Sequence, residues 1–145
     1  MSEFNLANAV SVFSTYAGAD LSLWGLYVAA GFTAGGFGAS MGDQFTTPAA
    51  IFLIAGYAAF AAAHLKGVLN NLSVRETMAA EIAGRLAAAH GPVTEFPATV
   101  AAATMIPFGR RFTYVLHGVV DFCVIAVIVT TALTPDLNSA GVNPM

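Results

Sequence analysis

Three long apolar stretches dominate the hydrophobic pattern of the chain. Residues 21–41 are uncharged, and residues 48–65 contain no Asp, Glu, Lys or Arg; a short polar break, Gly42-Asp43-Gln44, separates the two stretches. The third stretch covers residues 112–133 and is followed by Pro135. Each stretch has about the 20 residues that a helix needs to cross a ~30 Å hydrocarbon core. The pattern predicts a hairpin of two transmembrane helices followed by a third transmembrane helix.

The segment before the first stretch has a weaker pattern. Leu6, Val10, Phe13 and Ala17 recur every three or four residues, which indicates one apolar helix face. Because this face carries no basic residue, residues 1–18 are predicted to form an interfacial helix, or a helix packed on the protein's own spans. Gly18 is expected to end it, and Asp20 to cap the next helix.

The segment between the second and third stretches is more polar. Asn70-Asn71 is interpreted as a linker, and Ser73 with Glu76 fits the S-x-x-E capping box that starts a helix. Residues 73–90 are therefore predicted to form an amphipathic connector helix with an i,i+4 pair between Glu81 and Arg85. Its apolar side is predicted to consist of Met78, Ile82, Ala83 and Leu86.

Two further segments complete the expected organisation. Residues 96–109 are apolar, but Pro97 and Pro107 interrupt them, which favours an interfacial or re-entrant segment. Residues 134–145 form a short polar tail. The whole chain, 1–145, is predicted to be a single membrane domain.

Composition supports the membrane assignment and limits the partners. Of the 145 residues, 57% are hydrophobic and 9% are charged, whereas soluble domains have about 25% charged residues. The predicted fold class is an all-α integral membrane protein.

The single cysteine of the chain, Cys123, excludes an intrachain disulfide and a multi-cysteine metal site. Five Lys and Arg against eight Asp and Glu leave no basic surface for nucleic acid, so the expected partners are the lipid bilayer and other membrane subunits or copies of the chain.

The basic residues predict an orientation. All five lie between the second and third stretches: Lys66, Arg75, Arg85, Arg110 and Arg111. Since Lys- and Arg-rich loops stay on the cytoplasmic side, the connector and the N-terminus are predicted to be cytoplasmic and the C-terminus to lie outside. The predicted location is the bacterial inner (cytoplasmic) membrane.

Small residues form two stripes in the predicted hairpin. The first stretch carries Gly31, Gly35, Gly38 and Gly42, and the second carries Ala55, Ala59 and Ala62. Small residues at these spacings let transmembrane helices approach closely. The two stripes are predicted to pack on each other, either within one chain or between copies.

Polar residues in the spans are the candidates for chemistry. His117 and Asp121 are four residues apart in the third stretch and therefore share a helix face, and His64 lies near the end of the second. Three interpretations are open for Asp121: a hydrogen bond from His117 or His64 that fixes helix register, a proton relay or cation site, and a bond to a partner subunit. A haem held by His64 and His117 is a further alternative, and the sequence does not specify a cofactor.

These features predict a protein that acts by helix association, as an accessory or structural subunit of a larger membrane complex or as a homo-oligomer. A proton- or ion-conducting element that uses His117 and Asp121 is the first alternative, and a holin-like membrane pore former is the second. An enzyme is not expected, because no candidate nucleophile has a base beside it and no phosphate-binding loop is present.

Overall fold

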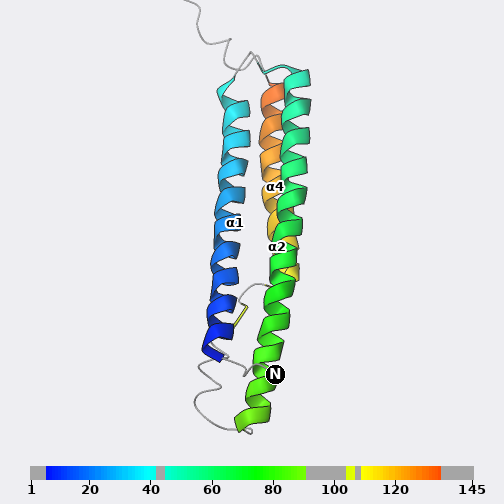
Figure 1. The fold of residues 1–145 in the computed structure, drawn as a ribbon. Coiled ribbons are helices and arrows are strands. Elements are labelled where there is room, and N and C mark those ends of the chain that lie inside the picture. Colours follow the sequence, from blue (N-terminus) through cyan, green and yellow to red (C-terminus); the bar gives the residue numbers. More distant parts are fainter. Residues whose placement is uncertain (1–5, 42–44, 91–103, 107–108, 135–145) are drawn as a thin grey trace, which may run out of the picture. The chain divides into compact units, whose positions relative to one another are not determined.

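The computed structural model describes residues 6–41, 45–90, 104–106 and 109–134 (Figure 1). These residues form three helices, α1 (Leu6–Ser40), α2 (Thr47–His90) and α4 (Arg110–Leu133), and no strand. The all-helical prediction is confirmed for this part of the chain. The predicted break at residues 42–44 lies outside the described residues, as do most of the interfacial segment over 96–109 and all but the first residue of the tail over 134–145.

Two of the helices have the length and composition of membrane spans. They are α2 over Thr47–Ala88 and α4 over Arg110–Leu133, with mean hydropathies of 1.7 and 2.2 in their most apolar windows. The first predicted span, residues 21–41, lies in α1 but for its last residue. The count of three crossings stays a prediction.

The helix α1 does not break at Gly18, as the sequence had suggested, and Asp20 lies inside it rather than at a helix start. The reason is a set of contacts with α2. Asp20 accepts hydrogen bonds from Arg75 and Asn71, and the ring of Phe13 lies 5.2 Å from the Arg75 guanidinium carbon. Since Phe13 and Asp20 flank Gly18 and contact the same part of α2, the helix is held on both sides of the glycine.

The helix α2 is likewise continuous through the predicted linker at Asn70-Asn71, so the capping box at Ser73 does not start a helix. Asn71 is buried, and its amide donates to the Tyr16 carbonyl oxygen at 3.0 Å. A polar residue that resembles a linker in the sequence thus makes an interhelical contact. The predicted helix 73–90 is the C-terminal part of α2, and its Glu81–Arg85 pair is confirmed at 2.7 Å.

Buried positions recur along α2 at alternating spacings of four and three residues. They include Tyr57, Ala61, His64, Val68, Asn71, Arg75 and Ile82. This alternation is typical of helices that pack along a shared seam. Four of the seven side chains are polar, so the seam of α2 carries both apolar packing and polar contacts.

The chain forms two compact units, and the boundary between them falls within all three helices. Unit 1 comprises Met1–Leu23 and Gly67–Thr113, and unit 2 comprises Trp24–Lys66 and Tyr114–Met145. In unit 1, Ile82 and Leu86 of α2 pack against Ala9 and Val10 of α1. The apolar face of the predicted interfacial helix is therefore covered by protein along this part of α1.

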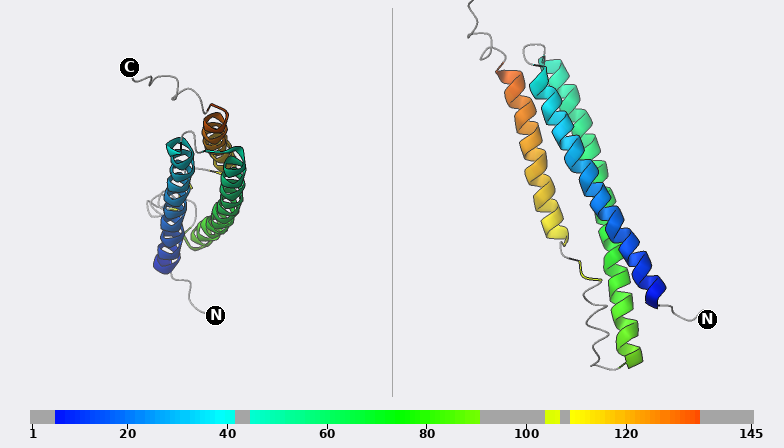
Figure 2. Two further views of the ribbon diagram at one scale, coloured as in Figure 1. Left: turned by 90° about the horizontal axis from the view of Figure 1, so that it is seen from above. Right: turned by 90° about the vertical axis from the view of Figure 1, so that its left-hand side faces the viewer.

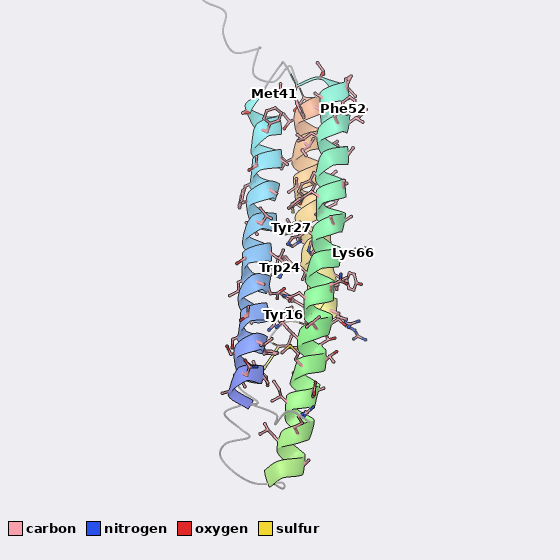
Figure 3. All side chains as sticks on the ribbon, viewed as in Figure 1. Tyr16, Trp24, Tyr27, Met41, Phe52 and Lys66 are labelled. Atoms are coloured by element: carbon pink, nitrogen blue, oxygen red, sulfur yellow. The ribbon has the colours of Figure 1, made fainter. Side chains whose placement is uncertain are left out.

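Unit 2 has the larger apolar core. The parts of α1, α2 and α4 that belong to it lie side by side in both sets of views (Figures 1 and 2). The core includes Tyr27, Ala34, Phe45, Tyr57 and Ile128, all buried. Large apolar side chains such as Phe52 point away from the core (Figure 3), and Phe52 is 78% exposed. Other exposed large apolar side chains of this unit include Leu26, Phe32 and Phe122.

Candidate functional site

A carboxylate lies among the aromatic side chains of unit 2. Asp121 of α4 accepts two hydrogen bonds on its Oδ1 atom, from the Tyr27 hydroxyl of α1 at 2.5 Å and from the Tyr57 hydroxyl of α2 at 3.0 Å. Helices α1 and α2 therefore each donate one hydroxyl group to a single carboxylate oxygen of α4. We call Tyr27, Tyr57, His64, His117 and Asp121 the Asp121 cluster.

Two histidines continue the cluster away from the carboxylate. The Nε2 atom of His117 lies 3.1 Å from the Nδ1 atom of His64, a hydrogen bond in which either ring can be the donor. At the other side of its ring, the Nδ1 atom of His117 lies 4.0 Å from Asp121 Oδ2. This separation is too long for a hydrogen bond, and the buried Nδ1 has no hydrogen-bond partner among the described residues.

Aromatic rings enclose the histidines. The Tyr27 ring stacks on His64 with centroids 4.7 Å apart and lies 4.2 Å from the His117 ring. Trp24 packs on His117 at 5.1 Å, and both Trp24 and Tyr27 point to the inner side of α1 (Figure 3). As a result His117 is only 2% exposed, whereas the Asp121 side chain keeps 30% exposure. Polar groups in such surroundings interact strongly because little water screens them.

Metal and haem ligation are the alternatives to compare with this geometry. Within the described residues, no group of three His, Cys, Asp or Glu side chains is placed to hold a metal ion. Two imidazoles that ligate one haem iron from opposite sides would have their nitrogens about 4 Å apart with the metal between them. In this structure the facing nitrogens of His64 and His117 are 3.1 Å apart and bond each other, which does not fit that alternative.

The predicted polar residues His64, His117 and Asp121 are thus brought together in one cluster. Sequence reasoning missed Tyr27 and Tyr57, which provide the hydrogen bonds to Asp121. They are 94 and 64 residues away from it along the chain, so no local spacing could reveal the contact. The seven-residue step from Tyr57 to His64 along α2 was an available signal, since residues at that spacing share a helix face.

The glycine stripe packs on a different partner from the one expected. A Cβ atom added at Gly31 would meet Val124 of α4 at 3.3 Å, and one added at Gly38 would meet Phe45 at 3.5 Å and Ile128 of α4 at 3.8 Å. Gly35 lies closest to Val127, also on α4. The predicted partner stripe of Ala55, Ala59 and Ala62 is exposed. The pairing of the two stripes within one chain is therefore wrong. The buried face of α2 contains Tyr57, and the three alanines lie on its exposed side. Gly42, the last glycine of the stripe, lies outside the described residues.

Unit 1 contains a second polar cluster of different composition. The Nη1 atom of Arg75 lies 3.1 Å from Asp20 Oδ2, and the two side chains are only 7% and 20% exposed. The Asn71 amide donates to Asp20 Oδ1 at 3.3 Å. This is a compensated ion pair, and we call these three residues the Asp20 cluster.

No family model, no curated protein and no solved structure matches this chain. The functional interpretation therefore depends on the geometry of the two clusters.

Proposed function

We propose that this protein is an integral membrane protein that exchanges protons through the Asp121 cluster. The observation that supports this function is the arrangement around one carboxylate: two tyrosine hydroxyls on Oδ1, and a pair of hydrogen-bonded histidines that begins 4.0 Å from Oδ2. Histidine changes its charge between pH 5 and 8, and ionisable groups inside a membrane commonly mark proton paths.

A charge on Asp121 is costly in the proposed span. An ionised Asp at the centre of a transmembrane helix costs about 2.5–3.5 kcal/mol on the insertion scale. The hydroxyls of Tyr27 and Tyr57 offset part of this cost, but they bring no positive charge. The histidines of the cluster are the groups placed to exchange a proton with this carboxyl group.

The finer topology is part of the same proposal. Three spans, residues 21–41, 48–65 and 112–133, would cross a bacterial inner membrane with the N-terminus in the cytoplasm. The contacts of Gly31 and Gly38 with α4 support the first span, since they place it against another apolar helix. The clustering of all five basic residues between the second and third spans supports the orientation.

Proton flux into liposomes tests the proposal. The purified full chain is reconstituted with a pH-sensitive dye inside, and an acid pulse is applied with potassium and valinomycin for charge compensation. We expect wild-type protein to acidify the interior, Asp121→Asn to reduce the rate to that of protein-free liposomes, and the exposed control Glu81→Gln to leave it unchanged. Equal flux in wild type and Asp121→Asn would reject the proposal, and release of a large trapped dye would indicate the holin-like pore instead.

Helix association is the second candidate function, and one observation favours it. The Ala55, Ala59 and Ala62 face of α2 is exposed, and small residues at such spacings are typical of interfaces between transmembrane helices. The chain would then serve as an accessory subunit or as a homo-oligomer.

Mass measurement in mild detergent tests the association. We expect an oligomer, or a co-purified membrane subunit, that Ala59→Leu disrupts and that Gly36→Leu preserves, because a side chain at Gly36 meets nothing within 4 Å. A wild-type monomer without partners would exclude this candidate.

A further inference from the structure

The two oxygens of Asp121 have different surroundings. Oδ1 accepts from both tyrosine hydroxyls, whereas Oδ2 has no hydrogen bond among the described residues. The polar atom that it faces is Nδ1 of His117, at 4.0 Å. Oδ2 is therefore the atom of this carboxylate that is open to a new bond.

The facing nitrogen is also open. His117 is 2% exposed, and its Nδ1 is buried without a hydrogen-bond partner in the described part of the chain. Nδ1 of His117 and Oδ2 of Asp121 can each donate or accept a hydrogen bond, according to protonation. If one of them carries a proton and the side chains rotate slightly, the two atoms can form a hydrogen bond with each other. The pair of Nδ1 and Oδ2 is thus placed so that a single shared proton can form a hydrogen bond between them.

Among the described residues, no Lys or Arg is paired with this carboxylate. The titratable groups around it are Tyr27 from α1, Tyr57 and His64 from α2, and His117 from its own helix. In contrast, Asp20 lies 3.1 Å from the always charged Arg75. An uncompensated charge in apolar surroundings is unfavourable, and the two aspartates differ in whether a permanent positive charge lies beside them.

We propose that Asp121 Oδ2 is a reversible binding site for H⁺ rather than for Na⁺, and that its protonated form reacts with hydrophobic carbodiimides. This inference rests on the proposed function and identifies its ion and its atom. Hard cations need several oxygen ligands. Here the open oxygen faces a ring nitrogen, and both tyrosine hydroxyls lie on the other oxygen, so the described groups suit a proton.

The histidine pair supplies a balanced route for that proton. The route begins when His64 takes up a proton and its Nδ1–H donates to His117 Nε2, with the Nδ1–H of His117 facing the Asp121 carboxylate. The Nδ1 proton of His117 moves to Oδ2, and the Nδ1 proton of His64 moves to His117 Nε2. Both rings end neutral and Asp121 ends as a carboxylic acid, so one positive and one negative charge disappear together.

Dicyclohexylcarbodiimide is the probe. The acid O–H adds across one C=N bond of the reagent: the oxygen bonds the central carbon, the proton goes to nitrogen, and rearrangement to the N-acylurea retains the mass of a one-to-one adduct. The full chain in liposomes is treated between pH 5 and 9 and mapped by mass spectrometry. We expect one adduct, at Asp121, whose rate of formation falls about tenfold per pH unit above its midpoint, because only the protonated acid reacts. Added Na⁺ is expected to leave the rate unchanged.

Matched variants separate this site from other carboxyl groups. Asp121→Asn is expected to remove the adduct, and Asp20 serves as an internal control that stays unmodified beside Arg75. Tyr57→Phe keeps the carboxyl group but deletes one donor to its ionised form, so we expect the midpoint of labelling to move to higher pH. Tyr114→Phe, an exposed tyrosine on the same helix, is expected to leave the midpoint in place.

Three results would overturn the inference: no adduct at Asp121 in the folded wild type, protection of Asp121 by Na⁺, or a midpoint that Tyr57→Phe does not move. The outcome is distinguishable from that of the proposed function. An adduct at Asp121 without proton flux supports the binding site and rejects conduction, whereas flux without an adduct supports conduction and rejects the site.

Discussion

Two aspartates of this protein contact buried polar residues of the same helix, α2, and differ in what neutralises them. Asp20 in unit 1 receives the Arg75 guanidinium at 3.1 Å and the Asn71 amide at 3.3 Å. Asp121 in unit 2 receives two hydroxyl groups, at 2.5 and 3.0 Å. Asp20 is paired with the permanent positive charge of Arg75, whereas Asp121 is paired with uncharged hydroxyl groups.

This difference is the basis for assigning a structural role to Asp20 and for proposing a functional one for Asp121. An ion pair with Arg keeps its charges over the whole physiological range, since arginine does not lose its proton. It can fix the register of α1 against α2, but it cannot take up a proton without being broken. The hydroxyl groups around Asp121 stabilise the ionised form and tolerate the neutral one. Only the Asp121 cluster can therefore change its charge while its contacts persist.

The largest expected effect comes from the same substitution at the two aspartates. Asp20→Asn leaves the charge of buried Arg75 uncompensated and should lower the free energy of unfolding by about 3 kcal/mol, the low end of the range for a broken buried pair because Asp20 is partly exposed. Asp121→Asn keeps an oxygen for the tyrosine hydroxyls and should cost less than about 1 kcal/mol. Unfolding by SDS in mixed micelles, followed by the fluorescence of the single tryptophan, Trp24, measures both.

The control for this prediction is the double variant Asp20→Asn with Arg75→Leu. Because it removes both charges, it should recover part of the stability that Asp20→Asn loses. If Asp121→Asn were the more destabilising of the two single variants, the assignment of the structural role to Asp20 would be wrong.

Overpacking at Gly31 should disturb unit 2 without changing a polar group. A Cβ atom at this position meets Val124 at 3.3 Å and the Tyr57 hydroxyl at 3.7 Å. Gly31→Leu is therefore expected to cost about 1–3 kcal/mol and to slow proton flux by displacing Tyr57. Gly36→Leu is the matched control, since nothing lies within 4 Å of its added atom. Equal stability of the two variants, measured in the same micelles, would contradict the α1–α4 contact.

The two hydroxyl groups on Asp121 can be removed one at a time. Tyr27→Phe and Tyr57→Phe are each expected to lower the free energy of unfolding by about 1–2 kcal/mol at a pH where Asp121 is ionised. The loss should shrink at acidic pH, because a protonated carboxyl group depends less on these donors. Losses that do not change with pH would show that the rings stabilise the unit through packing alone.

The smallest effect is expected from an exposed ion pair in unit 1. Arg110 Nη2 lies 2.8 Å from Glu76 Oε2, with side chains 55% and 40% exposed. Glu76→Gln should change the free energy of unfolding by about 0.2–1 kcal/mol, and by less at high salt. A loss as large as that of Asp20→Asn would show that pairing, rather than burial, makes the Asp20 cluster important.

Local features of the sequence were sufficient for part of this picture. Long uncharged runs predicted helices because backbone groups without water must bond within their own segment, and the described residues are helical there. The spacing of His117 and Asp121 placed both on one face of α4, and the Glu81–Arg85 pair formed as expected. The predicted interruptions at Gly18 and Asn71 were wrong, because glycine and asparagine are weak helix breakers that tertiary contacts override.

The sequence by itself determined the helical, apolar character of this protein and the presence of a carboxylate where a charge is costly. Only the tertiary structure decided what neutralises each carboxylate: Arg75 for Asp20, and the hydroxyls of Tyr27 and Tyr57 for Asp121. The physical reason is the distance along the sequence over which each kind of information acts. Helix periodicity acts over three or four residues, whereas these contacts join residues 55 to 94 positions apart along the chain, and only the packing of one helix on another can select them.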